Sequence, residues 1–532
     1  MITDHIMASI ADLAQEVSQY FASLQWERLG AMLSYNPSEP LLFSSGFFLF
    51  LFLALTLVYM ALRKALTPRI LFLTLFSYYF FYKSSGMYFL LLVLVTVTDF
   101  YIAKGVSRLK EKADEQAERE RRALGEEEAT PHYGRAKGLL ALSLAIDLGL
   151  LCYFKYTNFF AGMVTQMIGS NFQPWDIFLP VGISFYTFKT ISYVVDVYRG
   201  KMKPMESLLD YAFYVSFFPT LLAGPIVRAT DFAPQIRRPL QISNQLFGMG
   251  AYFVLIGLAK KCIISDYIAQ NFVDRIFDNP TLFSGGEVLL GLYGYTVQIY
   301  CDFSGYSDLA IGLAALMGFR LQDNFRFPYQ ATSLTEFWHR WHISLSTWFR
   351  DYVYIPLGGN RRGELRTYLN HLATMLIAGV WHGATGMFVV WGLLHGVGLV
   401  VNKFFHRHVF VQIPPSPFAK PLAWLTTFGY VAFAWIFFRA PSPTTALQLL
   451  HQISSDCSLT EFLPFLAARP LWTVLTLVAL ELHSVRERDY LWLRDRFVAL
   501  PWLLKFLVAL VVVQAAINLS GASVQPFIYS RF

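Results

Sequence analysis

LLFSSGFFLFLFLALTLVYMAL, residues 41–62, is an almost unbroken run of apolar residues with no charged side chain. A helix of about 20 such residues is long enough to cross the hydrocarbon core of a bilayer. A strand of a membrane β-barrel would instead alternate apolar and polar positions, and this run does not alternate. The stretch therefore predicts an all-α membrane protein.

The rest of the chain has the same character. Of its 532 residues, 55% are hydrophobic and 15% are charged, whereas about 25% of the residues in soluble domains are charged. Further apolar runs lie at 69–82, 87–103, 138–157, 176–197, 207–223, 245–261, 284–301, 305–319, 367–382, 385–404, 419–438, 470–483 and 503–520. These runs predict a polytopic protein with about 11–14 spans.

The chain divides into three parts. Residues 1–40 carry apolar positions every three to four residues, which predicts an N-terminal amphipathic extension rather than a cleavable signal peptide. Residues 41–520 form the membrane domain, and 521–532 are a C-terminal tail. The one long hydrophilic loop, 104–137, is charged and helix-forming, so we expect a solvated cytoplasmic helix, with a partner-docking element as the alternative.

The basic residues predict the orientation. They cluster in short segments between apolar runs, and the positive-inside rule then makes 104–137 and 320–366 cytoplasmic and the N-terminus external. Arg228, Arg237 and Arg238 fall on the wrong side in this count, so either their segment re-enters the membrane or the count slips there. The net charge of +7 is explained by these segments, and no nucleic-acid-binding module is visible.

Several function classes lose their support. The four cysteines are scattered, without a C-x-x-C pair, so the sequence suggests neither a zinc site nor a disulfide framework. The sequence also lacks a G-x-S-x-G elbow, a P-loop and an H-E-x-x-H motif. Hydrolase, ATPase and zinc-protease functions are therefore not indicated.

Two histidines are the candidate catalytic residues. His342 lies in TEFWHRWHISLSTWFRDYVYIPLGGNRRG (335–363), and His382 ends the apolar run 367–382. An ionisable group at membrane depth is costly and marks function by default, and imidazole exchanges protons near neutral pH. Each has a plainer alternative: an interfacial Trp-rich helix around His342, and a hydrogen-bonded core histidine for His382. His395 fits the core alternative better still.

Two further clusters each allow a functional and a purely structural interpretation. Asn360, Arg361 and Arg362 end a Gly-rich turn that either binds phosphate through N–H and guanidinium groups or is an ordinary basic turn. Asp302 and Asp308 interrupt two apolar runs, and they either orient a histidine or bind substrate, or they cap broken helix ends.

Four stretches together resemble the membrane-bound O-acyltransferase family, in the bacterial branch of the alginate-type O-acetyltransferases. They are LPVGISFYTFKTISYVVDVYRG (179–200), FFPTLLAGPIVRATDF (217–232), the region 300–361 with its IPLGGN motif, and AGVWHGATGMFVVWGLLHG (378–396). The resemblance implies a multi-pass protein of the bacterial inner membrane. It also implies re-entrant and interfacial helices, a central funnel, His382 as catalytic base and His342 as the second motif histidine.

The resemblance further implies an O-acyltransferase without a permanently bound cofactor. The expected reaction moves an acyl group, most simply acetyl, from a cytoplasmic thioester such as acetyl-CoA to an exported polysaccharide such as alginate or cellulose, directly or through a periplasmic acetyltransferase partner. His342 would orient the donor or stabilise an oxyanion, and Asn360, Arg361 and Arg362 would meet the donor's phosphates. The alternatives are D-alanyl transfer to teichoic acid and a non-catalytic polysaccharide or acyl transporter.

Overall fold

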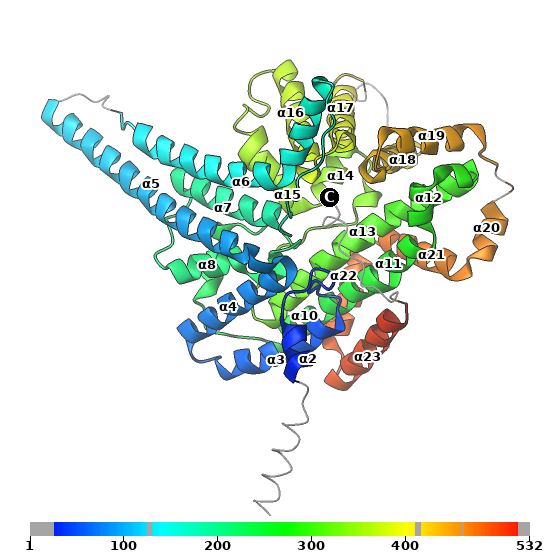
Figure 1. Ribbon diagram of the computed structural model, residues 1–532, viewed down its shortest axis with the longest axis horizontal. Coiled ribbons are helices and arrows are strands. Elements are labelled where there is room, and N and C mark those ends of the chain that lie inside the picture. The colour runs from blue at the N-terminus through cyan, green and yellow to red at the C-terminus, as the bar shows by residue number, and fades with distance from the viewer. Residues whose placement is uncertain (1–25, 125–129, 410–415, 459, 461, 520–532) are drawn as a thin grey trace, which may run out of the picture.

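The computed structural model describes residues 26–124, 130–409, 416–458, 460 and 462–519, and this part of the chain is helical without strands (Figure 1). The α-helices are α2 (Trp26–Leu33), α3 (Gly46–Ala61), α4 (Leu66–Ser85), α5 (Phe89–Leu124), α6 (Gly134–Met167), α7 (Ile183–Tyr198), α8 (Leu208–Ser216), α9 (Ala229–Ile236), α10 (Asn244–Leu258), α11 (Asp266–Ile268), α12 (Asp274–Asp278), α13 (Gly285–Leu316), α14 (Leu334–Arg340), α15 (Ile343–Phe349), α16 (Glu364–His382), α17 (Gly386–His408), α18 (Ala419–Arg439), α19 (Pro443–Ser455), α20 (Phe462–Ala468), α21 (Pro470–Ser484), α22 (Glu487–Ala499) and α23 (Trp502–Leu519). Single π-helical segments lie at Ala259–Ser265, Ala269–Val273 and Arg350–Tyr354.

The predicted all-α polytopic class is confirmed. Within the described residues, six continuous helical stretches are long and apolar enough to span a membrane: Leu66–Ala123, Gly134–Met167, Asn244–Asp278, Gly386–His408, Ala419–Arg439 and Trp502–Leu519. The pair α20 and α21, bent by 105°, adds a seventh if it counts as one span. The remaining expected spans correspond to shorter helices or to halves of longer ones, since 284–301 and 305–319 together form the single helix α13.

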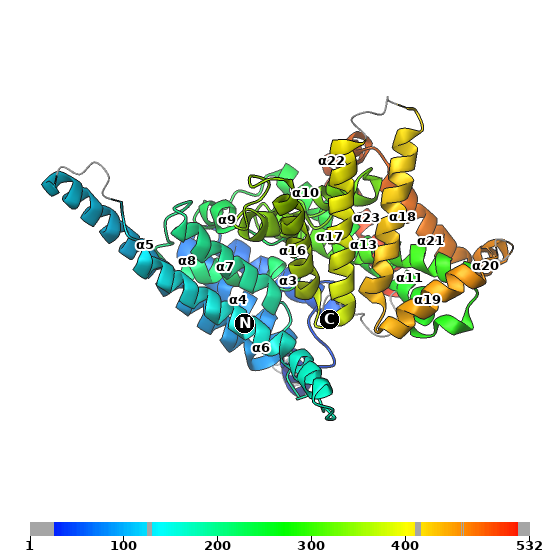
Figure 2. The ribbon, with the colours of Figure 1, turned by 90° about the horizontal axis from the view of Figure 1, so that it is seen from above.

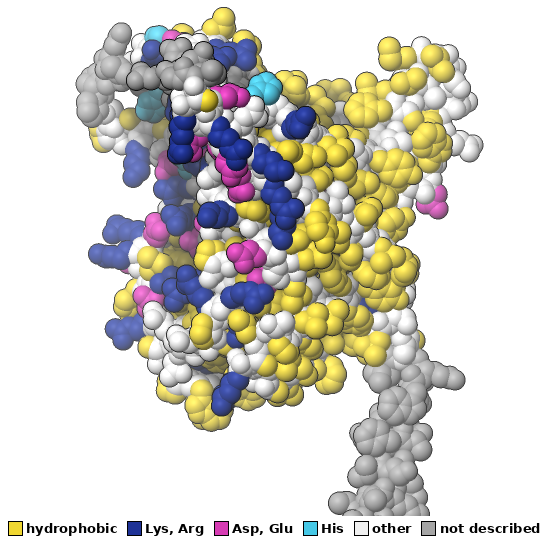
Figure 3. Space-filling model, turned by 90° about the vertical axis from the view of Figure 1, so that its left-hand side faces the viewer, with side chains coloured by type: hydrophobic (Ala, Val, Ile, Leu, Met, Phe, Trp, Pro, Cys, Tyr) yellow, Lys and Arg dark blue, Asp and Glu magenta, His cyan; other side chains and the backbone are white. Residues whose placement is uncertain are grey.

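The surface matches a protein embedded in lipid. Large apolar side chains are exposed on the spanning helices, and α23 has almost no buried side chains. Figure 3 shows Lys and Arg side chains gathered along one side of the molecule, with a broad hydrophobic surface beside them. This separation follows from the different solvation of charged and apolar groups, and it agrees with the charge pattern from which the orientation was inferred.

The long hydrophilic loop is largely helical, as predicted. α5 continues from its apolar first half through the charged sequence to Leu124, and α6 packs against it on the return. The two helices project together from the body of the protein (Figures 1 and 2). A partner-docking role for this projection stays a prediction. Most of the N-terminal extension (1–25) and the whole C-terminal tail (521–532) lie outside the described residues, so their predicted boundaries stay predictions as well.

The expected span 207–223 does not form one helix long enough to cross a membrane. α8 has only 9 residues, about 14 Å of helix, and the chain then turns back through a short 3₁₀ turn at Phe218–Thr220. Arg228 consequently lies 3.6 Å from Asp351, a residue of the basic segment 320–366. The structure therefore supports the re-entrant alternative, which removes the conflict in the charge count.

Close backbone packing positions two of the motifs. Gly182 has a φ of 79°, and a Cβ there would lie 2.5 Å from the carbonyl oxygen of Leu221, so the break at 179–185 packs directly on the re-entrant segment. A Cβ on Gly379 would lie 2.4 Å from the carbonyl oxygen of Phe388. The glycine therefore allows α16 and α17 to cross closely, just before α16 ends at His382.

Candidate active site

His342 lies at a break between two short helices. α14 begins at the N-cap Ser333, whose hydroxyl accepts the Glu336 N–H, and it ends at Arg340. His342 then adopts φ 43° and ψ 56°, a left-handed conformation that is uncommon for a residue with a Cβ. Backbone bonds from Arg326 N to Arg340 O and from Ile343 N to Asn324 O hold the break in place. Strained backbone of this kind persists only where its surroundings fix it.

The tryptophans around this break belong to the core. Trp341 and Trp348 are 1% and 5% exposed, so the alternative of an interfacial helix with its Trp residues at headgroup level is wrong. The sequence pattern resembled one amphipathic helix because it cannot reveal the left-handed residue that divides it.

Asn324 determines which nitrogen of His342 carries the proton. Its Oδ1 lies 3.1 Å from His342 Nδ1 and 3.2 Å from the Ser344 backbone nitrogen. A backbone N–H can only donate, so the atom facing both groups is the amide oxygen. His342 must therefore donate from Nδ1, which leaves the lone pair of the neutral ring on Nε2.

The other ring nitrogen of His342, Nε2, makes no hydrogen bond within the described part of the chain. His342 is fully buried, and its Nε2 has no hydrogen-bond partner among the described residues. The Phe303 ring packs edge-on against the imidazole at 4.5 Å. A buried, oriented lone pair without a protein partner is suited to accept a hydrogen bond from a substrate.

His382 is the last residue of α16 and is also buried. Its ring packs edge-on against Trp391 at 5.0 Å and Phe438 at 5.3 Å. The Lys155 ammonium on α6 donates to the carbonyl oxygens of Trp381 at 2.6 Å and His382 at 2.9 Å. Helix C-terminal carbonyls lack partners within their own helix, so this lysine satisfies them and fixes the position of His382.

One cavity brings His382 and Lys155 together. It has a volume of about 100 Å³ and is lined by His382, Lys155, Phe185, Tyr306 and the break 179–184, among others. Phe185 stacks on the His342 ring at 6.5 Å and packs against Trp381 at 5.8 Å, so it lies between the two histidine segments. The implied central funnel stays a prediction.

Trp391 packs against both His395 and His382. The Trp391 ring is 4.8 Å from His395 and 5.0 Å from His382. His395 does not line the cavity that His382 lines, and it packs among Phe337 and Trp338. The structure thus agrees with the interpretation of His395 as a core histidine.

The predicted phosphate-binding turn lies elsewhere. Asn360, Arg361 and Arg362 are exposed at the start of α16, and none of them lines the His382 cavity. α16 has 19 residues, so the turn lies about 28 Å from His382 along the helix axis. The structure does not bring these three residues to the histidines.

The Asp302 and Asp308 cluster does not cap broken helix ends, because α13 runs unbroken from Gly285 to Leu316. Lys261 Nζ lies 2.6 Å from Asp302, and Lys260 Nζ lies 2.7 Å from Asp308. Both lysines come from the π-helical segment after α10. The capping alternative was wrong because buried charges on one helix can be neutralised by a neighbouring helix.

Sequence reasoning missed Lys155 and Asn324. Lys155 had a visible signal, since it is a charged residue inside the apolar run 138–157 and such residues mark function by default. Asn324 had none, because only the fold places it beside a histidine 18 positions later.

Comparison with known proteins identifies the family. Residues 202–442, which include both histidines, match the model of the membrane-bound O-acyltransferase family. The chain is similar to a probable alginate O-acetylase of Pseudomonas aeruginosa, 39% identical over 425 residues, or 78% of this chain and 75% of the relative. It is also similar to a peptidoglycan O-acetyltransferase of Helicobacter pylori, 38% identical over 340 residues, or 58% and 63%. A teichoic acid D-alanyltransferase of Bacillus subtilis is 29% identical over 281 residues, or 50% and 70%.

The expected family, enzyme class and location are confirmed by these matches together with the apolar helices. The protein is a multi-pass O-acyltransferase of the bacterial inner membrane. The chain belongs to the membrane-bound O-acyltransferase family, in the branch of the alginate O-acetylases.

Proposed function

We propose that this protein transfers an acetyl group from a cytoplasmic thioester, with acetyl-CoA as donor, to a hydroxyl of an exported polysaccharide. The observation that carries the proposal is the cavity in which His382 and Lys155 meet, with Phe185 of its lining packed against the His342 ring. The acetyl group and the polysaccharide acceptor rest on the greater similarity to the two acetyl-transferring relatives than to the D-alanyltransferase.

In the proposed step, His382 removes the proton from the acceptor hydroxyl as its oxygen attacks the thioester carbonyl carbon. The C–S bond then breaks, and the thiolate takes the proton back from the His382 imidazolium. The products are an O-acetyl ester and a free thiol. A positioned histidine contributes about 10²–10⁴-fold to the rate of such a step.

Of the two roles expected for His342, orienting the donor and stabilising an oxyanion, the geometry favours the first. A neutral ring protonated at Nδ1 cannot donate a hydrogen bond from Nε2, so His342 is unsuited to stabilise an oxyanion in this tautomer. It is suited to accept a hydrogen bond from an amide N–H of the donor or from the acceptor hydroxyl. We assign it this orienting role.

Lys155 is the better candidate for oxyanion stabilisation. An ammonium group has three N–H donors, and two of them reach the carbonyls of Trp381 and His382. The third has no acceptor among the described contacts, and the side chain lines the same cavity as His382. A fixed positive charge beside a developing oxyanion lowers the barrier without further reorganisation.

The acetyl group reaches the polymer either directly or through a periplasmic acetyltransferase partner. The donor is charged and the acceptor is a large polymer on the other side of the membrane. A site that each substrate reaches from its own side needs to transport neither of them. The two remaining alternatives, D-alanyl transfer and transport without chemistry, differ in products that can be measured directly.

The test uses the full protein purified in detergent with radiolabelled acetyl-CoA and a polysaccharide acceptor. We expect ester-linked acetyl on the polymer, identified by mass. His382→Ala abolishes it at normal protein level, whereas His395→Ala, a matched buried histidine outside the cavity, retains it. Because detergent leaves no second compartment, transfer there rules out a pure transporter. Normal acetylation by His382→Ala, or a D-alanyl mass increment on polymer modified in cells, refutes the proposal.

A further inference from the structure

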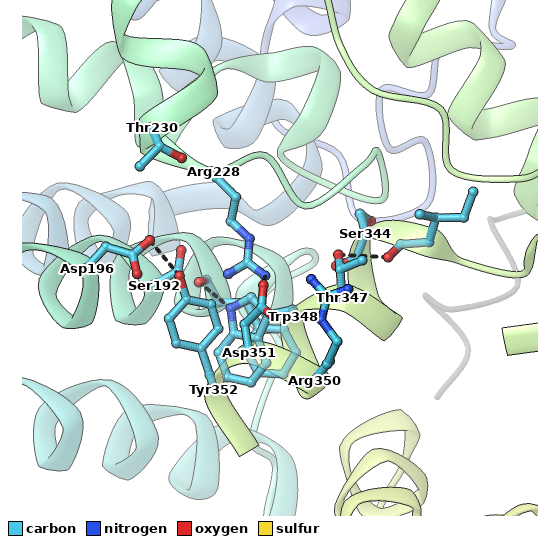
Figure 4. A network of polar contacts seen from close by, with 12 residues as sticks. Ser192, Asp196, Arg228, Thr230, Ser344, Thr347, Trp348, Arg350, Asp351 and Tyr352 are labelled. Atoms are coloured by element: carbon cyan, nitrogen blue, oxygen red, sulfur yellow. Dashed lines mark hydrogen bonds and ion pairs between the residues drawn. The ribbon is translucent and has the colours of Figure 1, made fainter. Parts of the chain in front are cut away.

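The network in Figure 4 lies outside the cavity described above. Tyr352 donates its hydroxyl to Asp196 at 2.6 Å and is surrounded by three cations. The guanidinium of Arg228 lies 4.4 Å from the ring centroid, that of Arg199 lies 5.3 Å away, and the Lys201 ammonium lies 5.9 Å away. We call Arg199, Lys201 and Arg228 around Tyr352 the Tyr352 basic cluster.

Arg228 has unused hydrogen-bonding capacity in a buried place. Its side chain is only 11% exposed, and neither Nη1 nor Nη2 has a hydrogen-bond acceptor among the described residues. The nearest carboxylate oxygen, Asp351 Oδ2, is 3.6 Å from Nη2, beyond direct hydrogen-bond range. A buried guanidinium with unsatisfied N–H groups costs free energy unless a ligand or an ion pairs with it.

The charge of the network leaves room for an anion. Four cations meet two carboxylates there: Arg199, Lys201, Arg228 and Arg350 against Asp196 and Asp351. Arg199 and Lys201 are exposed, while Arg228 lies beneath them. A planar guanidinium at the base and two exposed cations at the rim form an arrangement that suits a phosphate group.

An aromatic column joins this cluster to the catalytic histidine. Tyr352 packs against Trp348 at 5.1 Å, Trp348 stacks on Phe188 at 3.9 Å, and Phe188 stacks on Trp381 at 5.2 Å. Trp381 packs against His382 at 4.9 Å. The cluster and His382 are thus fixed on one rigid scaffold, roughly 20 Å apart at most.

This distance decides between two candidate phosphate sites. A pantetheine arm has about 13 bonds between its sulfur and its phosphorus, and at about 3.5 Å per three bonds it spans roughly 15 Å when extended. With the acetyl group and its approach to the base added to that length, the donor is comparable to the separation of at most about 20 Å between the cluster and His382. It does not bridge the separation of about 28 Å between His382 and the turn 360–362.

We propose that the Tyr352 basic cluster binds a phosphate of the acyl donor and so holds the thioester at His382. This inference rests on the proposed function and replaces the earlier assignment of the donor phosphates to Asn360, Arg361 and Arg362. Anchoring the arm at one end of a rigid scaffold positions the thioester carbonyl at the other end.

The test compares two donors with the same arm and thioester. Acetyl-CoA carries phosphates and S-acetylpantetheine carries none. Arg228→Gln is expected to raise KM for acetyl-CoA about tenfold or more, to change kcat less than twofold, and to leave KM for S-acetylpantetheine unchanged. Arg199→Gln/Lys201→Gln, which alters exposed residues only, should act in the same direction more weakly. Arg361→Gln/Arg362→Gln is the matched control on the exposed turn and should change nothing.

Three results overturn the proposal. The first is that both cluster variants keep the wild-type preference for acetyl-CoA, while their thermal unfolding shows that they are folded. The second is that the turn variant removes the preference instead. The third concerns the source of the phosphate: if nanodiscs with anionic phospholipid raise KM for acetyl-CoA in wild type but not in Arg228→Gln, the cluster holds a lipid headgroup. Transfer from S-acetylpantetheine by Arg228→Gln shows that the proposed function stands in any of these cases.

Discussion

Replacement of Asn324 tests how the site controls the His342 ring. Asn324 Oδ1 accepts from His342 Nδ1 and from the Ser344 nitrogen and hydroxyl, and Asn324 Nδ2 donates to the Ser307 hydroxyl at 3.1 Å. Asn324→Ala removes all of these bonds in a fully buried place. The His342 Nδ1–H is then unsatisfied, and the ring can turn to the other tautomer.

The size of the effect follows from the lost bonds. Leaving one buried donor without a partner costs about 1–3 kcal/mol. Because Nε2 has no partner among the described residues either, the two tautomers then differ little in free energy and the ring is no longer oriented, so kcat should fall about 10–100-fold. The unsatisfied Ser344 N–H lowers stability by a similar free energy, which should reduce the midpoint of thermal unfolding.

Two variants separate positioning from folding. Asn324→Asp keeps an acceptor at the same place and should recover much of the lost kcat. Ser344→Ala removes a hydroxyl but leaves the bond between Asn324 and His342, so its kcat should stay within threefold of wild type. The assay is steady-state acetyl transfer by purified protein, with unfolding midpoints measured on the same samples. If folded Asn324→Ala keeps wild-type kcat, the tautomer argument is wrong.

Two further predictions concern buried lysines. Lys155→Met should lower kcat about 10–10³-fold by removing the charge beside the oxyanion, and Lys155→Arg should recover part of it; an unchanged kcat in folded Lys155→Met would contradict the assignment. Lys261→Met leaves Asp302 and Asp266 without their cation and should destabilise the protein by about 3–5 kcal/mol. Lys260→Met should cost less because the Lys260–Asp308 pair is more exposed, so equal unfolding midpoints for the two variants would contradict this reading.

The sequence by itself determined the class of the fold. Long apolar runs without alternation leave a helix as the structure that satisfies every backbone group within its own segment. It also singled out His342 and His382, because ionisable side chains near apolar runs are conspicuous, and the comparisons confirm the family that it indicated. Lys155 was readable by the same rule.

Only the tertiary structure decided how these residues work together. The tautomer of His342 depends on Asn324, 18 residues away, and the end of α16 is held by Lys155, 227 residues away from His382. The carboxylates inside α13 are paired with lysines of a neighbouring helical segment. Local periodicity reports which face of a segment is apolar, but hydrogen bonds and ion pairs between distant segments form only after the helices pack. For that reason the sequence placed the donor phosphates on the exposed turn, while the packed structure points to Arg228.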